Sequence, residues 1–240
     1  MKIINLFLNL YHLLKYKTKL RLILLYLVHI FFLNFFKKKK SKILKKWRNL
    51  LKNQKYNFTM NNITQSVHLI EKIKLNYLNR KINIILIGCF EGMSSIFFLN
   101  TFNIKNLYCV DIWNKSFYKK SKIKPNINAE KYFDLNTSGF LQIKKFKTST
   151  DLFFKHYNSH KVDIIYLDAS HDYLNVYKDA INAWNILKKD GYLIFNSFLY
   201  RSNPVHKYNN LIGINLFIKK NNIYFKLISI SSNMLILKKK

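Results

Sequence analysis

The stretch that decides the fold is VDIIYLDASHDYLNVYKDAINAWNILKKDGYLIFNS, residues 162–197. Its first part, VDIIYLD, is almost entirely apolar, which is typical of a strand buried on both faces. Residues 172–188 then carry apolar side chains at helical spacing, and residues 191–197 return to the strand pattern. A strand, a helix and a second strand in succession predict a βαβ unit with two parallel strands.

The same alternation continues on both sides of this unit. Upstream, the pattern predicts helices over 63–80, 92–102, 128–137 and 149–157, and strands over 82–88, 106–111 and 140–146. Downstream, it predicts a helix over 209–220 and two closing strands over 222–229 and 232–238. We therefore expect an α/β fold: a doubly wound, mostly parallel, seven-stranded, Rossmann-like sheet with an antiparallel C-terminal edge. Residues 63–240 would form this domain, behind a polar linker over 51–62 and a helical, apolar and lysine-rich extension over 1–50.

The chain is strongly basic, with 42 Lys or Arg and 11 Asp or Glu in 240 residues and a net charge of +31. Residues 1–70 hold 15 of the basic residues and none of the acidic ones. Nucleic acid and anionic membranes are the partners that such a charge attracts, although abundant Lys and Asn also fit an AT-rich genome. Arginine is scarce and no RNA-binding module is recognisable, so nucleic acid is the less favoured partner.

Residues 1–50 contain two apolar runs, 3–14 and 20–36, each followed by lysines. The second run has 17 residues, the lower limit of the roughly 17–25 that span a membrane. Three interpretations are open: the segment lies on the cytoplasmic leaflet, spans the membrane once, or forms a helical hairpin that covers the main domain or a second subunit. The first is favoured and predicts a cytoplasmic protein at the inner face of the membrane. The oligomeric state is not predicted.

The two cysteines, Cys89 and Cys109, both lie in apolar, strand-like runs. This placement favours reduced core residues of an intracellular protein. A disulfide framework is not expected, because such frameworks are dense in cysteine.

Polar residues follow the predicted strands at the carboxyl ends, where doubly wound sheets bind their ligands. The first strand ends in the loop Gly88-Cys89-Phe90-Glu91-Gly92-Met93-Ser94. Gly88 permits a tight turn, Gly92 lets the backbone approach a ligand, and Ser94 suits hydrogen bonding at the start of the next helix. The loop is not G-x-G-x-x-G, which disfavours a dinucleotide or nucleotide-sugar enzyme.

Acidic residues end two other strands. Asp111 ends strand 106–111, and its carboxylate suits the two hydroxyls of a ribose. Asp168 ends strand 162–168 and is followed by His171, so these two residues are a candidate acid–base pair. The structural alternatives are helix capping by Asp111, and a helix start at His171 with Asp172 as the cap.

These residues resemble class I S-adenosylmethionine-dependent methyltransferases, and more closely a bacterial group of sugar and small-molecule O-methyltransferases. The resemblance covers about 60–240 and is carried by IILIGCFEGMS, by VDIW and by the stretch from residue 162. It implies an S-adenosylmethionine cofactor with its ribose on Asp111 and its adenine near Thr148 and Ser149. It also implies a cofactor contact at Trp113 and a methionine subsite at Gly88, Glu91, Gly92 and Ser94.

The resemblance implies methyl transfer to a hydroxyl of a small molecule or a glycan. An RNA methyltransferase and a catalytically degenerate, membrane-associated binding protein are the alternatives. The family's acid near the end of the first strand is replaced by Leu86, and its paired acids after the fifth strand by Asn196 and Ser197. In metal-dependent relatives those paired acids help the aspartate at the position of Asp168 to hold Mg²⁺. Asp168 beside one amide is a poor magnesium site, so no essential metal is expected.

Overall fold

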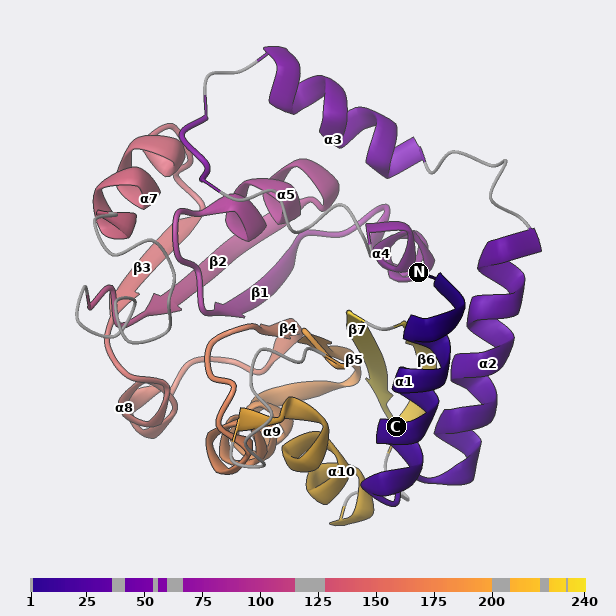
Figure 1. Ribbon diagram of the computed structural model, residues 1–240. Coiled ribbons are helices and arrows are strands. Elements are labelled where there is room, and N and C mark those ends of the chain that lie inside the picture. The colour runs from indigo at the N-terminus through magenta and orange to yellow at the C-terminus, as the bar shows by residue number, and fades with distance from the viewer. Residues whose placement is uncertain are drawn as a thin grey trace. The chain divides into compact units, whose positions relative to one another are not determined.

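The computed structural model describes residues 2–35, 42–53, 56–59, 67–114, 128–199, 208–220, 225–231 and 233–240. The chain forms two compact units, one of residues 41–162 and one of residues 1–40 with 163–240. Each unit contributes strands and covering helices of its own (Figure 1).

The unit of residues 41–162 is built on three parallel strands, β1 (Ile82–Ile87), β2 (Ile104–Asp111) and β3 (Ile143–Lys147), with β2 paired to both neighbours. β1 is buried along nearly its whole length, which matches its run of isoleucine and leucine. Its described helices are α3 (Lys42–Asn53), α4 (Val67–Lys74) with the 3₁₀ turn η2 (Leu75–Tyr77), α5 (Met93–Thr101), α7 (Ala129–Thr137) and α8 (Thr150–His156). The start of the predicted linker is therefore helical, because α3 runs to Asn53.

The other unit contains β4 (Val162–Leu167) from its second residue onward, and β5 (Leu187–Asn196), β6 (Phe225–Ile230) and β7 (Met234–Lys239). β7 pairs antiparallel with both β5 and β6. Its described helices are α1 (Lys2–Lys15), α2 (Leu20–Phe35), α9 (Tyr173–Ile186) and α10 (Asn210–Lys220). The seven strands have the sheet order β3-β2-β1-β4-β5-β7-β6. This order confirms the predicted seven-stranded Rossmann-like fold with an antiparallel C-terminal edge.

The boundary between α9 and β5 differs from the prediction. The sequence pattern extended the helix to residue 188, but α9 ends at Ile186 and β5 begins at Leu187. Leu187 is fully buried and has an extended backbone, with φ −73° and ψ 136°. Its apolar side chain continues the helical spacing of Ala183 and Trp184, which is why the pattern alone placed it in the helix.

Both cysteines lie in the core, as predicted. Cys89 and Cys109 are buried and unbridged. Burial raises the pKa of the Cys89 thiol well above its ordinary value, so this thiol is inert at neutral pH.

The helices α9 and α10 approach closely at Gly213. A Cβ at this position would lie 2.3 Å from the carbonyl oxygen of Tyr173 and 3.0 Å from Cβ of Val176. The first contact is with backbone, which has little freedom to move away. Only glycine therefore allows α10 to pack at this distance.

Replacing Gly213 with alanine should destabilise the protein by about 2 kcal/mol. Overpacking typically costs about 1–3 kcal/mol, and the better helix propensity of alanine offsets up to about 1 kcal/mol of it. The free energy of unfolding in urea measures the effect. Gly139→Ala is the matched control, because a Cβ at Gly139 would meet nothing within 4 Å. Equal midpoints for the two variants would show that α10 shifts away from α9 at no cost.

The helices α1 and α2 form a hairpin that is anchored within its own unit. The side chains of Leu13, Leu22, Ile23 and Tyr26 are buried, and α2 contacts β6. Asn215 on α10 donates from Nδ2 to the carbonyl oxygen of Tyr16 (3.2 Å) and to Oγ1 of Thr18 (2.9 Å). This packing favours the hairpin interpretation of the N-terminal segment. None of the described helices combines the length and the apolarity that crossing a membrane requires.

Candidate functional site

The loop after β1 turns the chain sharply into α5. Gly88 and Gly92 both have φ 85°, in the left-handed region that glycine tolerates. Phe90 also has a positive φ, 46°, which is uncommon for a residue with a side chain. The amide of Gly88 donates to the carbonyl oxygen of Val110 on β2 (2.9 Å). The loop therefore lies directly beside the end of the second strand.

Asp111 ties this loop to the turn after β2. Its Oδ2 accepts a hydrogen bond from the amide of Phe90 (2.8 Å), and its Oδ1 accepts one from the amide of Trp113 (2.9 Å). The indole Nε1 of Trp113 donates back to the carbonyl oxygen of Phe90 (2.8 Å). Asp111 therefore holds the glycine loop against the turn after β2.

Trp113 supports the loop from the side. It is only 5% exposed, and its ring lies 4.8 Å from that of Phe133, centroid to centroid. Lys145 places Nζ 4.9 Å from the indole centroid. The indole thus braces the loop, and its predicted contact with a cofactor stays a prediction.

The side chain of Glu91 is hydrogen-bonded to Thr59. Its Oε2 accepts hydrogen bonds from the amide (2.7 Å) and from Oγ1 (3.1 Å) of Thr59. Asn136 on α7 donates to the carbonyl oxygen of Glu91 (2.8 Å) and pairs with both the amide and the carbonyl of Asn57. The sequence patterns did not single out Thr59. These contacts hold a chain segment against the glycine loop.

Gly92 and Ser94 occupy the start of α5. A Cβ at Gly92 would lie 3.1 Å from Cγ2 of Thr137 and 3.2 Å from Cδ2 of Phe133. Close packing against α7 therefore requires this glycine, whatever approaches the loop. Ser94 lies in the first turn of α5 and is partly exposed.

The segment after β3 reaches the same place. The amide of Thr148 donates to the carbonyl oxygen of Asp111 (3.0 Å). Ser149 caps α8, with Oγ accepting from the amide of Leu152 (3.3 Å). The structure thus gathers the glycine loop, Asp111, Trp113 and Ser149 at the carboxyl ends of β1, β2 and β3.

The other unit holds the remaining candidate residues. Asp168 and His171 follow β4 and line one small cavity of about 20 Å³, together with Ser170, Asp179, Asn196 and Asn210 among others. This volume holds about one water molecule. Asp172 caps α9 by accepting from the amides of Leu174 and Asn175, as the capping alternative predicted.

His171 is held by a residue that the sequence patterns did not single out. Its Nδ1 lies 3.2 Å from Oδ1 of Asn210, at the start of α10. Burial lowers the pKa of His171 below its ordinary value, although the hydrogen bond to Asn210 acts in the opposite direction. The imidazole is therefore neutral at pH 7. Within the described ranges, no group of three or more His, Cys, Asp or Glu is arranged to hold a metal ion.

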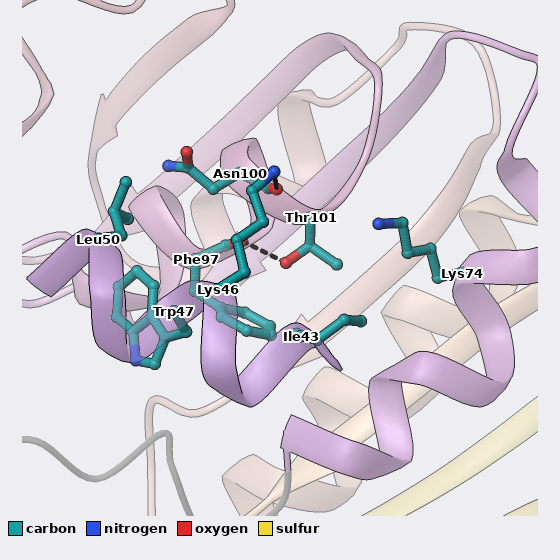
Figure 2. A pocket seen from close by; sticks show the side chains of 8 residues that line it. All are labelled: Ile43, Lys46, Trp47, Leu50, Lys74, Phe97, Asn100 and Thr101. Atoms are coloured by element: carbon teal, nitrogen blue, oxygen red, sulfur yellow. Dashed lines mark hydrogen bonds between the residues drawn. The ribbon is translucent and has the colours of Figure 1, made fainter. Parts of the chain in front are cut away.

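A second small cavity, of about 10 Å³, lies between α3, α4 and α5 (Figure 2). Its lining is mainly apolar, from Ile43, Trp47, Leu50 and Phe97, and Lys46 donates across it to the carbonyl oxygen of Asn100 (3.1 Å). No acid or His lines it. We therefore treat it as a packing gap under α3 and not as a reaction site.

Comparison with known proteins identifies the fold family. Residues 85–198 match a protein family described as a methyltransferase domain. These residues make up just under half of the chain, and they are similar to a methyltransferase domain. The matched residues run from β1 to just beyond β5, and so include the glycine loop, Asp111, Asp168 and His171.

Solved structures share the fold of this methyltransferase domain. A putative caffeoyl-CoA O-methyltransferase from Staphylococcus aureus is 17% identical with a TM-score of 0.55, covering 89% of this chain and 100% of that one. The O-methyltransferase TomG from Streptomyces achromogenes, solved in complex with SAM (S-adenosylmethionine), is 13% identical with a TM-score of 0.54, covering 91% and 98%. An uncharacterized mimivirus protein, R132 of Acanthamoeba polyphaga mimivirus, is 25% identical over 143 residues. That match spans 57% of this chain and 61% of the viral protein.

These findings confirm the predicted family, the predicted fold and S-adenosylmethionine as the cofactor of the family. They do not support the alternatives of an RNA methyltransferase or a degenerate binding protein. The acceptor and the roles of the individual site residues stay predictions.

Proposed function

We propose that the methyltransferase domain transfers a methyl group from S-adenosylmethionine to a hydroxyl of a small molecule or a glycan. The proposal rests on the position of Asp111. Its carboxylate accepts hydrogen bonds from the glycine loop and from the turn after β2. An acid in this position suits the 2′- and 3′-hydroxyls of adenosine, because a carboxylate accepts hydrogen bonds from hydroxyl groups.

The residues around the loop fit the rest of the cofactor. Glu91 is 2% exposed, and its Oε1 has no hydrogen-bond partner among the described residues. A buried carboxylate oxygen without a donor is costly, and the ammonium group of the methionine tail is such a donor. In this assignment Glu91 takes over from the acid that Leu86 replaces. Thr148 and Ser149, which follow β3 beside Asp111, would lie near the adenine.

His171 acts as the general base in this proposal. When bound, S-adenosylmethionine would supply an electrophilic methyl group on its sulfonium, with the neutral thioether as the leaving group. His171 accepts the proton of the acceptor hydroxyl, and Asp168 lines the same cavity. The lowered pKa of His171 keeps the base unprotonated at neutral pH.

Labelled methyl transfer tests this function. The full chain is incubated with methyl-labelled S-adenosylmethionine and a cell extract, which is then separated into lipid, glycan, small-molecule, RNA and protein fractions. The proposal predicts label in a small-molecule or glycan fraction, bound through an alkali-stable ether. Label confined to RNA or protein would contradict the proposed acceptor class.

We also propose that residues 1–50 dock the domain of residues 63–240 on an anionic lipid surface at the inner face of the membrane. Each helix of the hairpin exposes an apolar stripe: Phe7, Leu8, Tyr11 and Leu14 on α1, and Leu20, Leu24 and Val28 on α2. Basic residues accompany both stripes, with Lys15, Lys17 and Arg21 exposed. Apolar side chains with a basic border favour the interface of an anionic bilayer. A second copy of the hairpin is a poorer partner, because it would bring like charges together.

A triple variant, Phe7→Glu with Leu14→Glu and Leu24→Glu, tests this surface on vesicles of phosphatidylglycerol and phosphatidylcholine. It should bind at least about tenfold more weakly than wild type, because it removes apolar contacts and adds charge that anionic lipid repels. Vesicle co-sedimentation measures the difference. Point variants are preferable to deleting residues 1–50, because α2 packs on β6 and deletion would expose this core.

Leu141→Glu is the matched control, because Leu141 is a 94% exposed leucine outside the hairpin. It should bind vesicles like wild type. Equal binding by the triple variant and the control would reject the docking surface. Loss of a concentration-dependent dimer in the triple variant, with vesicle binding unchanged, would assign the stripes to self-association instead.

A further inference from the structure

Asn210 is a buried polar residue that has no role in the methyl transfer proposed above. It is the first residue of α10, is 5% exposed, and lines the same cavity as Asp168 and His171. Its side-chain amide hydrogen bonds at both ends, to Ser197 and to His171. The two contacts together determine which way the amide points.

The contact with Ser197 orients the amide. Asn210 Nδ2 lies 3.2 Å from the carbonyl oxygen of Ser197, and a carbonyl can only accept a hydrogen bond. The nitrogen of the amide must therefore face Ser197, because the reversed amide would place two acceptors together. Asn210 Oδ1 is then the atom that faces His171 Nδ1, at 3.2 Å.

This orientation determines the protonation of the imidazole. An amide oxygen cannot donate, so His171 Nδ1 must carry the proton of this hydrogen bond. A neutral imidazole with its proton on Nδ1 has its basic lone pair on Nε2. The tautomer that a base acting through Nε2 needs is thus set by Asn210.

We propose that Asn210 is a positioning residue, which holds His171 in the Nδ1-protonated tautomer and so presents Nε2 as the base. The inference rests on the proposed role of His171 in methyl transfer. An amide gives this orientation without a charge, whereas a carboxylate in its place would stabilise the imidazolium and raise the pKa. The acids of the cavity, Asp168 after β4 and Asp179 on α9, are present in every variant below.

Nitrogen-15 NMR of the histidine side chains tests the tautomer directly. The His171 signals are assigned by their absence from the His171→Ala spectrum, and the measurement uses the full chain without cofactor or acceptor. At neutral pH the proposal predicts the Nδ1-protonated form in the wild type. Asn210→Ala should shift the population toward the Nε2-protonated form, and Asn210→Asp should raise the pKa of His171. A wild-type His171 protonated on Nε2 would overturn the proposal even if both variants failed to fold.

The kinetic readout separates positioning from a structural role. Asn210→Ala should lower kcat roughly tenfold to hundredfold, as expected for a misaligned catalytic group, with the KM for S-adenosylmethionine unchanged. Asn210→Asp should recover part of kcat with its pH profile moved to higher pH. Asn185→Ala, on the exposed side of α9, is the matched control and should match wild type.

The role of His171 as the base and the role of Asn210 in orienting it can be tested separately. If His171→Ala leaves transfer intact while the NMR result is as predicted, the proposed base is wrong and the orientation by Asn210 still holds. If Asn210→Ala changes neither the tautomer nor kcat, the positioning role is wrong and the proposed base is untouched.

Discussion

Replacing His171 with alanine will lower the rate of methyl transfer by about 10²–10⁴-fold, the usual contribution of a general base. Binding of S-adenosylmethionine should be unchanged, because the residues assigned to the cofactor lie after β1, β2 and β3. The measurement is the initial rate with the acceptor fraction labelled by the wild type, alongside calorimetry with the cofactor. His156→Ala is the matched control, because His156 is an exposed histidine on α8. A rate within a few-fold of wild type would exclude His171 as the base.

The pH dependence of transfer follows from the same residue. Protonated His171 cannot accept a proton, so the rate should rise with pH as the imidazole loses its proton. Burial lowers the pKa of His171 below the ordinary 6.5, so the rate should already be level at neutral pH. The profile of kcat/KM against pH measures this, and the rising limb should be absent in His171→Ala. A limb centred above pH 7 would point to a different base.

Replacing Asp111 with alanine will weaken S-adenosylmethionine binding by about 1.5–3 kcal/mol, the range for a hydrogen bond to a charged group. The change also releases the amides of Phe90 and Trp113, which hold the loop in its left-handed conformation. Isothermal titration calorimetry with the cofactor measures the loss. Unchanged affinity would remove Asp111 from the cofactor site.

Two further variants separate binding from folding. Asp111→Asn keeps one acceptor oxygen and should lie between wild type and Asp111→Ala. Asp151→Ala removes an exposed acid from α8 and should leave affinity unchanged. If Asp111→Ala unfolds, the intermediate affinity of Asp111→Asn still tests the assignment.

Much of the fold could be predicted because its strands carry distinct patterns. β4 is buried along its whole length, so VDIIYL is apolar throughout and cannot be mistaken for a surface strand. The position of Asp111 at a strand end followed from the same reasoning. Leu187 shows where prediction from sequence patterns fails, because a buried apolar residue fits the end of a helix and the start of a strand equally well.

The contacts that shape the site could not be read from local patterns. Asn210 lies 39 positions from His171 in the sequence, and no local sequence pattern indicates that the two side chains meet. Thr59 reaches Glu91 from 32 positions away. The packing role of Gly92 is another such feature, because a Cβ there would meet Thr137 and Phe133 of α7. Such contacts depend on how helices lie on the sheet, which a single sequence does not specify.

Hydrogen–deuterium exchange of the full chain with and without S-adenosylhomocysteine tests the central claim most directly. The account predicts slower amide exchange on binding in the peptides that contain Gly88–Ser94 and Asp111–Trp113. Saturable binding that leaves both segments unchanged, or no binding at millimolar ligand, would contradict it.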